Sequence, residues 1–152
     1  MIKLHKLPDI TPERLLQKPE QFIKAGKALF TVVHDIVGYK YTYSVIRATN
    51  GEKVYDIWYV NSLYKIQKNN WKYVYIGTIF GESFRRTTNS VAINRGENFD
   101  LFAHIIDKIN EGKPLPNFIK VYHANQCGRC GRMLTVPSSV KSGFGPVCIK
   151  HL

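Results

Sequence analysis

The spacing of cysteines at the C-terminal end is the feature that most restricts what this chain can fold into. Cys127, Cys130, Cys148 and His151 follow the pattern C-x2-C-x17-C-x2-H, and the chain has no other cysteine. A two-residue gap lets a tight turn direct both side chains at one ion, and a distant second pair completes a tetrahedron. Four protein ligands are typical of structural zinc, because a catalytic zinc keeps one position open. The spacing therefore predicts a structural zinc site.

The residues between these ligands favour a compact metal module. Gly128 and Gly131 stand where a knuckle turn needs free backbone angles. Gly145-Pro146 precedes a short terminal helix, which would present Cys148 and His151 at positions i and i+3 on one face. A knuckle followed by a helix-borne pair predicts a treble-clef or zinc-ribbon-like module.

The fourth ligand has two candidates. His151 fits the spacing, but it is the penultimate residue, where chains fray. His123, four residues before Cys127, is the alternative.

The chain has three cysteines. An odd number of cysteines argues against a secreted disulfide framework and favours reduced thiols that bind metal.

The segment GRCGRMLTVPSSVKSGFGPVC resembles an uncharacterised zinc-module family that is abundant in bacteriophage and related bacterial genomes. Its members carry a GRCGR-x-LT-x-P-x-S-x3-G-x-GP-x-C signature near the C-terminus. The likeness extends upstream, so that it covers Lys27 to Cys148. It implies that Cys127, Cys130 and Cys148 are metal ligands, and it implies a phage or prophage origin. It implies no reaction.

Upstream of the cysteines, segments rich in β-branched and aromatic residues alternate with turn residues and predict an antiparallel sheet. The predicted strands are Ala28–His34, Lys40–Arg47, Val54–Val60 and Trp71–Phe80, with shorter ones at Phe84–Thr88 and Phe118–Tyr122. Asn50-Gly51 predicts a hairpin with a type I′ turn, because both residues tolerate positive φ angles.

Helix signals flank these strands. They are a helix start at Thr11-Pro12-Glu13, a second at Pro19-Glu20 that ends near Gly26, an amphipathic helix over Asn98–Asn110, and a start at Pro137-Ser138-Ser139. The order predicts an α+β fold with a mostly antiparallel sheet, flanking helices and a C-terminal zinc module. We divide the chain into an N-terminal helical segment (1–26), the sheet with its helix (27–122) and the zinc module (123–152).

The chain carries a net charge of +11, from 22 Lys and Arg against 11 Asp and Glu. From Gly112 to Leu152 it has six basic residues and no acidic one. Such an excess attracts polyanions, so nucleic acid is the expected partner, and a lysine-rich solubilising surface is the alternative. The residues predicted to contact phosphate are Arg85, Arg86, Arg129, Arg132 and Lys141. The two knuckle arginines have a competing role, because they can balance zinc-bound thiolates.

The sheet aromatics offer a second binding element. Tyr43 and Tyr73 are predicted to form an exposed cross-strand platform for bases or a partner, and core packing of all these rings is the alternative. Strict alternation in Trp71–Ile79 would place Tyr73, Tyr75, Gly77 and Ile79 on the same face as Trp71.

Catalysis is not expected. Asp100, His104 and Asp107 share a helix face but lack a nucleophile, so a solvated face accounts for them. No apolar stretch approaches the roughly 20 residues of a membrane span, and the first residues do not form a signal peptide. We therefore expect a protein of the bacterial cytoplasm.

These observations predict a small, non-enzymatic, zinc-binding protein of phage type that binds nucleic acid through a basic surface. The alternative is a phage accessory protein that binds a host protein and inhibits or redirects it, in counter-defence or transcription takeover. A sheet edge with tyrosines suits protein contacts as well.

Overall fold

A single antiparallel sheet forms the body of the molecule, which a computed structural model describes over residues 7–67, 70–87 and 96–152. Its strand order is β5-β4-β3-β2-β1-β6. The strands are β1 (Lys27–His34), β2 (Lys40–Asn50), β3 (Lys53–Gln67), β4 (Asn70–Phe80), β5 (Ser83–Arg85) and β6 (Ile119–His123). All neighbouring strands are antiparallel. The predicted α+β class is confirmed.

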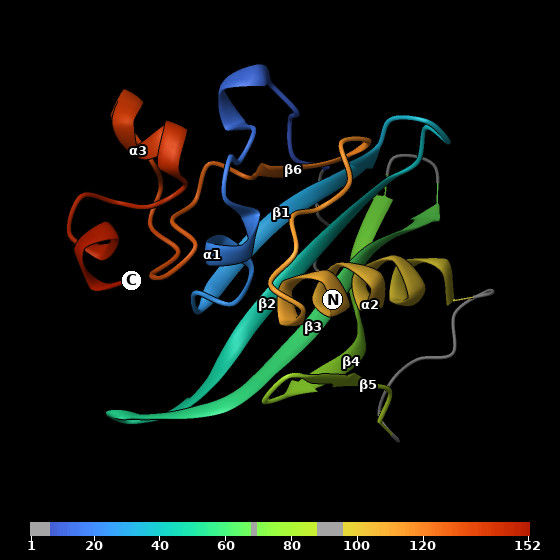
Figure 1. Ribbon diagram of the computed structural model, residues 1–152, viewed down its shortest axis with the longest axis horizontal. Helices are drawn as coiled ribbons and strands as arrows, with labels where there is room; N and C mark the ends of the chain where they lie inside the picture. Colours follow the sequence, from blue (N-terminus) through green and yellow to red (C-terminus); the bar gives the residue numbers. More distant parts are fainter. Residues whose placement is uncertain (1–6, 68–69, 88–95) are drawn as a thin grey trace.

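The helices are few and short except for one. They are η1 (Pro12–Arg14), α1 (Pro19–Ile23), α2 (Glu97–Asn110), α3 (Pro137–Ser142) and η3 (Cys148–His151). α2 lies across one face of the sheet, and the C-terminal segment sits at one end of it (Figure 1). In the described part of the chain, no helix is long and apolar enough to cross a membrane.

The core lies between α2 and the sheet. The rings of Phe30, Tyr43 and Phe102 pack with centroids 5.2–6.5 Å apart, and all three are fully buried. The Tyr43 hydroxyl donates to the Asn98 carbonyl at 2.8 Å, which satisfies the buried polar group. Tyr43 therefore cannot form an exposed platform, and that prediction is wrong.

A bulge in β4 changes which of its residues share a face. Val60 pairs with Gly77 but Asn61 pairs with Tyr75, so Ile76 is left over between the two pairs. An extra residue inverts the alternation on either side of it. Tyr73 and Tyr75 consequently face away from α2, whereas Gly77 faces it, and the prediction that they share one face is wrong.

The β2–β3 hairpin forms as predicted, but its turn differs. Asn50 pairs with Lys53, so the turn residues are Gly51 and Glu52. Only Gly51 has a positive φ, of 62°, whereas a type I′ turn needs two such residues. Beyond β1 and β4 this hairpin continues as a two-stranded arm, visible as the long extension in Figure 1.

Other boundaries differ from the prediction, most of all in β3, which ends at Gln67, seven residues beyond the predicted Val60. The first predicted helix is a single 3-10 turn, and Thr11 makes no side-chain capping bond. α1 ends at Ile23 with Lys24 as its C-cap, so Gly26 is not the cap. β5 ends at Arg85, and Thr88 of the predicted strand lies outside the described residues. The core contains Leu16, Phe30 and Phe144, one from each predicted segment; the division into three units stays a prediction.

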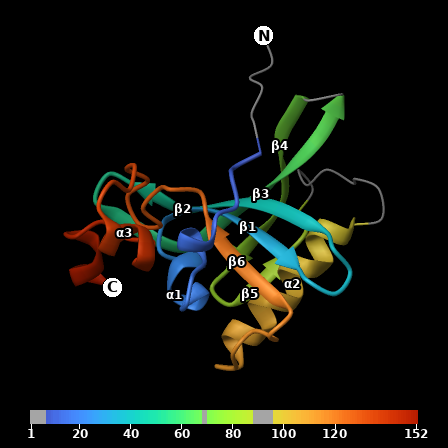
Figure 2. The same cartoon turned by 90° about the horizontal axis from the view of Figure 1, so that it is seen from above.

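The sheet has two unlike faces. α1 and α2 lie on the same side of it, and β3 and β4 curl toward the other side (Figure 2). We call the side away from α2 the open face, because no helix of the described residues covers it. By strand register, its side chains include Lys27, Leu29, Thr31, Val33, Lys40, Thr42, Ser44, Ile46, Tyr59, Asn61, Leu63, Lys65, Trp71, Tyr73, Tyr75, Thr78, Phe80, Arg85, Lys120 and Tyr122. Four of these are buried although no helix covers them: Thr31, Thr42, Leu63 and Thr78.

Candidate metal centre and nucleic-acid interface

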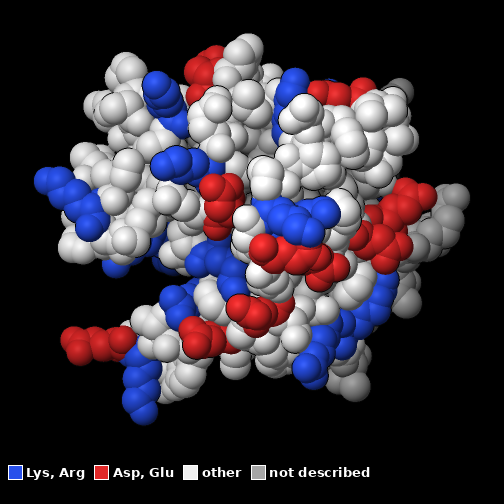
Figure 3. Space-filling view, in the orientation of Figure 1, with Lys and Arg blue, Asp and Glu red and all other residues white. Residues whose placement is uncertain are grey.

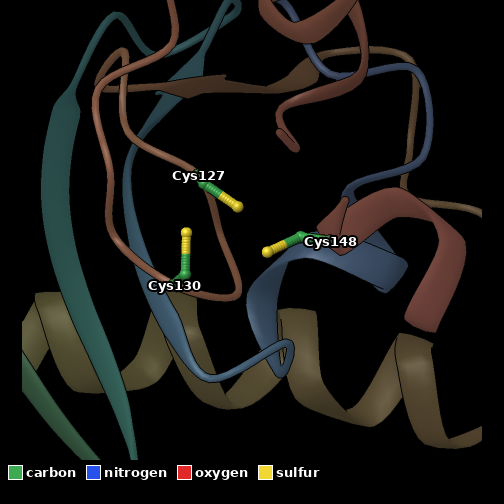
Figure 4. Close-up of side chains that lie close together, drawn as sticks. All are labelled: Cys127, Cys130 and Cys148. Carbon is green, nitrogen blue, oxygen red and sulfur yellow. The ribbon is translucent and has the colours of Figure 1, made fainter. Parts of the chain in front are cut away.

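Three cysteine side chains converge at the end of the sheet. The Sγ atoms of Cys127, Cys130 and Cys148 all lie within 4.8 Å of one another. The first two come from the turn after β6, and the third comes from the start of η3 (Figure 4). Residues 18 to 21 positions apart are thus brought to one point, and this cluster can hold a metal ion.

A tight turn presents the first pair. The Cys127 N–H donates to the Arg132 carbonyl at 2.8 Å, and the Gly131 N–H donates to the Cys127 carbonyl at 2.9 Å. Gly131 has a φ of 79°, a left-handed conformation that favours glycine. The sequence C-G-R-C-G therefore forms the predicted knuckle.

The segment from α3 to η3 brings the third cysteine, Cys148, to the first two. α3 ends at Ser142. Its C-cap, Gly143, has a φ of 83°, and the Gly143 N–H donates to the Ser139 carbonyl at 2.8 Å. The Gly145 N–H then points at the first cysteine, 3.4 Å from the Cys127 Sγ. The predicted helix start at Pro137 is confirmed, and Cys148 opens the terminal 3-10 turn.

The environment of the cluster favours a thiolate at one position. Burial raises the pKa of the Cys127 thiol, but N–H donation from the backbone of Cys130, Gly145 and Arg129 outweighs it, and the pKa falls to about 7. Burial raises the pKa of Cys148, and this is only partly opposed by the Arg129 guanidinium, whose Nη1 lies 3.9 Å from the Cys148 Sγ. Arg129 is thus placed to balance thiolate charge.

The donor set fits a tetrahedral zinc ion. Zn–S bonds of about 2.3 Å place sulfurs about 3.8 Å apart in a tetrahedron, so three sulfurs within 4.8 Å need to close by about an ångström or less. Soft thiolates select zinc over magnesium or calcium. Zinc bound here would hold Cys127, Cys130 and Cys148 together as a cross-link between the knuckle and η3.

The two histidines considered as a fourth metal ligand differ in their surroundings. His123 is buried, its Nδ1 accepts the Asn125 N–H at 3.0 Å, and its Nε2 lies 2.5 Å from the Val140 carbonyl. Both ring nitrogens are occupied, so His123 is a structural tie between β6 and α3. His151 is exposed and stands three residues after Cys148 in a 3-10 turn, where i and i+3 side chains eclipse. It lies outside the three-cysteine group, and its ligand role stays a prediction.

The metal module packs on the N-terminal helix through one phenylalanine. Phe22 of α1 is fully buried and contacts Phe144 at 5.7 Å between centroids. A Cβ on Gly128 would lie 2.6 Å from the Phe22 ring, and one on Gly143 would lie 2.9 Å from it. The ring fits against two glycines, which lets the knuckle approach the core.

The predicted phosphate-binding residues do not gather in one place. Arg85 lies on the open face, with its guanidinium 6.0 Å from the Phe80 ring. Arg86 alternates to the opposite face, where it lies 4.4 Å from the Phe99 ring of α2. Arg132 and Lys141 are exposed on the knuckle and on α3. As binding residues all five stay predictions, but they lie on different surfaces.

The open face carries two aromatic residues that the sequence did not predict, Tyr59 and Phe80, and one that it did, Tyr73. Tyr59 is 46% exposed and Phe80 is 42% exposed, while Tyr73 is half-buried beside a groove of about 450 Å³. This groove joins the sheet to the knuckle, and Lys27 and Cys130 also line it. Tyr59 was detectable, because it alternates with the buried Trp58 in the third strand.

Charge differs between the two faces. Acidic and basic groups are interspersed on the helix-covered side (Figure 3). On the open face, none of the strand residues in the described ranges is acidic, whereas Lys27, Lys40, Lys65, Lys120 and Arg85 are basic. Lys120 is paired with Asp35 at 3.0 Å. The α2 residues Asp100, His104 and Asp107 are exposed to solvent on the other side.

Comparison with known proteins found similarity only over the C-terminal residues 121–152. A family model described as "Family of unknown function (DUF6011)" matches residues 121–152, from β6 through the knuckle to η3. The chain is similar to that family over its cysteine module. Neither the search of curated proteins nor the search of solved structures gave a match. The likeness predicted upstream, from Lys27, stays a prediction.

Proposed function

We propose that this chain is a small, non-enzymatic protein, stabilised by one structural zinc ion, that binds nucleic acid through the open face of its sheet. Cys127, Cys130 and Cys148 hold the zinc, with His151 as the fourth ligand. The phage origin implied by the resemblance and a place in the bacterial cytoplasm belong to the same proposal.

One observation carries the nucleic-acid assignment: the open face combines exposed aromatic rings with basic side chains and carries no acidic strand residue in the described ranges. Cations neutralise phosphates, and aromatic rings stack on bases. A surface that only kept the protein soluble would mix both signs of charge, as the helix-covered face does.

The neighbouring arginines provide the test. Arg85→Gln removes one charge from the open face, and Arg86→Gln removes the same charge from the helix face. Binding of a labelled oligonucleotide is followed by fluorescence anisotropy over a series of salt concentrations. We expect Arg85→Gln alone to weaken binding and to lower the slope of log affinity against log salt by about one unit. Equal effects of the two variants would contradict the assignment to the open face, and no binding by the parent protein would contradict the function.

A second candidate is a protein partner, and one observation favours it. Met133 and Val147 on the zinc module are 73% and 66% exposed. Exposed methionine and aliphatic side chains are common at interfaces. A specific host protein that co-purifies with the parent, and is lost with Met133→Glu but kept with Arg85→Gln, would support this function.

A further inference from the structure

One row of paired residues crosses the open face from β1 to β5. Lys27 pairs with Ile46, Ile46 with Tyr59, Tyr59 with Thr78, and Thr78 with Arg85. Thr78 is buried, so the accessible side chains of the row are the other four. Paired residues point to the same face, and adjacent strands lie about 4.8 Å apart, so the row is about 19 Å long. It has a cation at each end and an aromatic ring in the middle.

Both ends of the row are held in place. A Cβ on Gly131 would lie 3.4 Å from the Lys27 Cδ, so the lysine stem runs along the knuckle. At the other end Arg85 lies over the Phe80 ring. Phe80 is a diagonal neighbour of Tyr59, because it lies two residues beyond the Tyr59 partner Thr78. The two exposed rings are therefore close together, between the two cations.

We propose that the ligand of this face is single-stranded nucleic acid, which crosses the strands along the row with a base stacked on Tyr59. This rests on the proposed nucleic-acid function. Phosphates meet Lys27 and Arg85, and the unpaired bases meet Tyr59, Phe80 and the apolar Ile46. A duplex keeps its bases stacked inside, so it can use the cations but not the rings.

Single-stranded DNA and single-stranded RNA share this chemistry. Both carry one phosphate per nucleotide and expose the faces of their unpaired bases, so the row accommodates either. The distinction falls to the 2′-hydroxyl, which only RNA carries. Matched DNA and RNA oligonucleotides of one sequence therefore form two arms of the experiment.

The test measures the affinity of the full chain for a labelled DNA single strand, an RNA single strand of that sequence and the corresponding DNA duplex. We expect tighter binding of at least one single strand than of the duplex. Tyr59→Ala should weaken single-strand binding by on the order of tenfold and leave duplex binding nearly unchanged. Tyr59→Phe retains the ring and should bind like the parent. Melting temperatures of both variants check folding, and the exposure of Tyr59 predicts small shifts.

The outcomes separate the two claims. Equal binding of single strand and duplex, with Tyr59→Ala without effect on either, overturns the single-strand inference while the proposed nucleic-acid function stands. No binding to any of the three probes overturns both. Loss of single-strand binding in Tyr59→Ala, with recovery in Tyr59→Phe, supports the stacking role.

Discussion

The sheet and the cysteine module, residues 123–152, differ in how much apolar surface they bury. Between α2 and the sheet, large rings and aliphatic side chains fill the space, with Phe30, Tyr43 and Phe102 fully buried. In residues 123–152 the buried apolar side chains are few, chiefly Leu134 and Phe144 beside Cys127 and Cys148. A segment of this size buries too little apolar surface to fold alone, and metal or other cross-links usually make up the difference.

With zinc bound as proposed, the sheet would depend on packing and the cysteine module on coordination. The sheet should tolerate loss of the metal, and the module should tolerate damage to the α2 core until the whole chain unfolds. Phe22 joins the two regions, because it packs against Phe30 of β1 and Phe144 of the module.

Removing a zinc ligand should unfold the module and spare the sheet. Cys148→Ser removes one thiolate, and structural zinc contributes an apparent 10–16 kcal/mol in small zinc peptides. We expect hydrogen exchange to show loss of protection at the Gly131 and Gly143 amides, with protection kept across β1 and β2. Ser138→Ala, an exposed change in the same module, is the control and should keep the metal. If protection falls equally in both regions, they form one cooperative unit.

Truncating a side chain in the core between α2 and the sheet should destabilise the sheet and leave metal binding unchanged. Phe102→Ala removes a fully buried ring and should lower the free energy of unfolding by about 3–5 kcal/mol in urea denaturation. Zinc content of the folded fraction should not change. Phe80→Ala, at an exposed ring, should cost about 0.5 kcal/mol or less. Loss of zinc in folded Phe102→Ala would show that the module depends on this core.

A methyl group at the junction should strain the contact between the two regions. A Cβ at residue 143 would lie 2.8 Å from the Leu16 Cδ2 and 2.9 Å from the Phe22 ring, and Gly143 has a φ of 83°. Gly143→Ala should therefore lower the free energy of unfolding by about 1–3 kcal/mol. Gly145→Ala is a matched control, since nothing lies within 4 Å of its Cβ position. Equal melting temperatures for the two variants would refute the tight junction.

The smallest effect concerns one hydrogen bond in the sheet region. Tyr43→Phe deletes the hydroxyl that donates to the Asn98 carbonyl at the start of α2. We expect a loss of about 0.5–1.5 kcal/mol of unfolding free energy, with no change in zinc binding. Tyr59→Phe on the open face should be close to neutral in the same denaturation experiment. A neutral Tyr43→Phe would mean that water or relaxation replaces this bond.

The local signals in the sequence were sufficient for most of the fold. β-branched and aromatic runs located the strands, and the apolar period of α2 placed its ends within a residue of Glu97–Asn110. The predictions that failed were those about which face a side chain occupies, because that depends on how the strands pair. The bulge at Ile76 changed the faces of β4, and the central position of β2 under α2 buried Tyr43. Neither the bulge nor the position of β2 in the sheet can be deduced from the alternation of residues in the sequence.

The metal site was more predictable than the binding surface. Ligand spacing is local within each pair, so the clustering of Cys127, Cys130 and Cys148 could be predicted from the sequence. The row proposed to bind nucleic acid was not predictable in this way, because Lys27, Tyr59 and Arg85 come onto one row only through strand order. Charge runs drew attention to Arg86, which alternation places on the helix side.

Zinc-edge X-ray absorption on the purified protein tests the central claim most directly, because it counts the ligands of the metal by element. The account predicts about one zinc per chain with three sulfur neighbours at about 2.3 Å and one nitrogen neighbour at about 2.0–2.1 Å. His151→Ala should remove the nitrogen contribution and keep the three sulfurs. A protein without zinc, whose three thiols react freely in the native state, or a metal shell without sulfur, would contradict it.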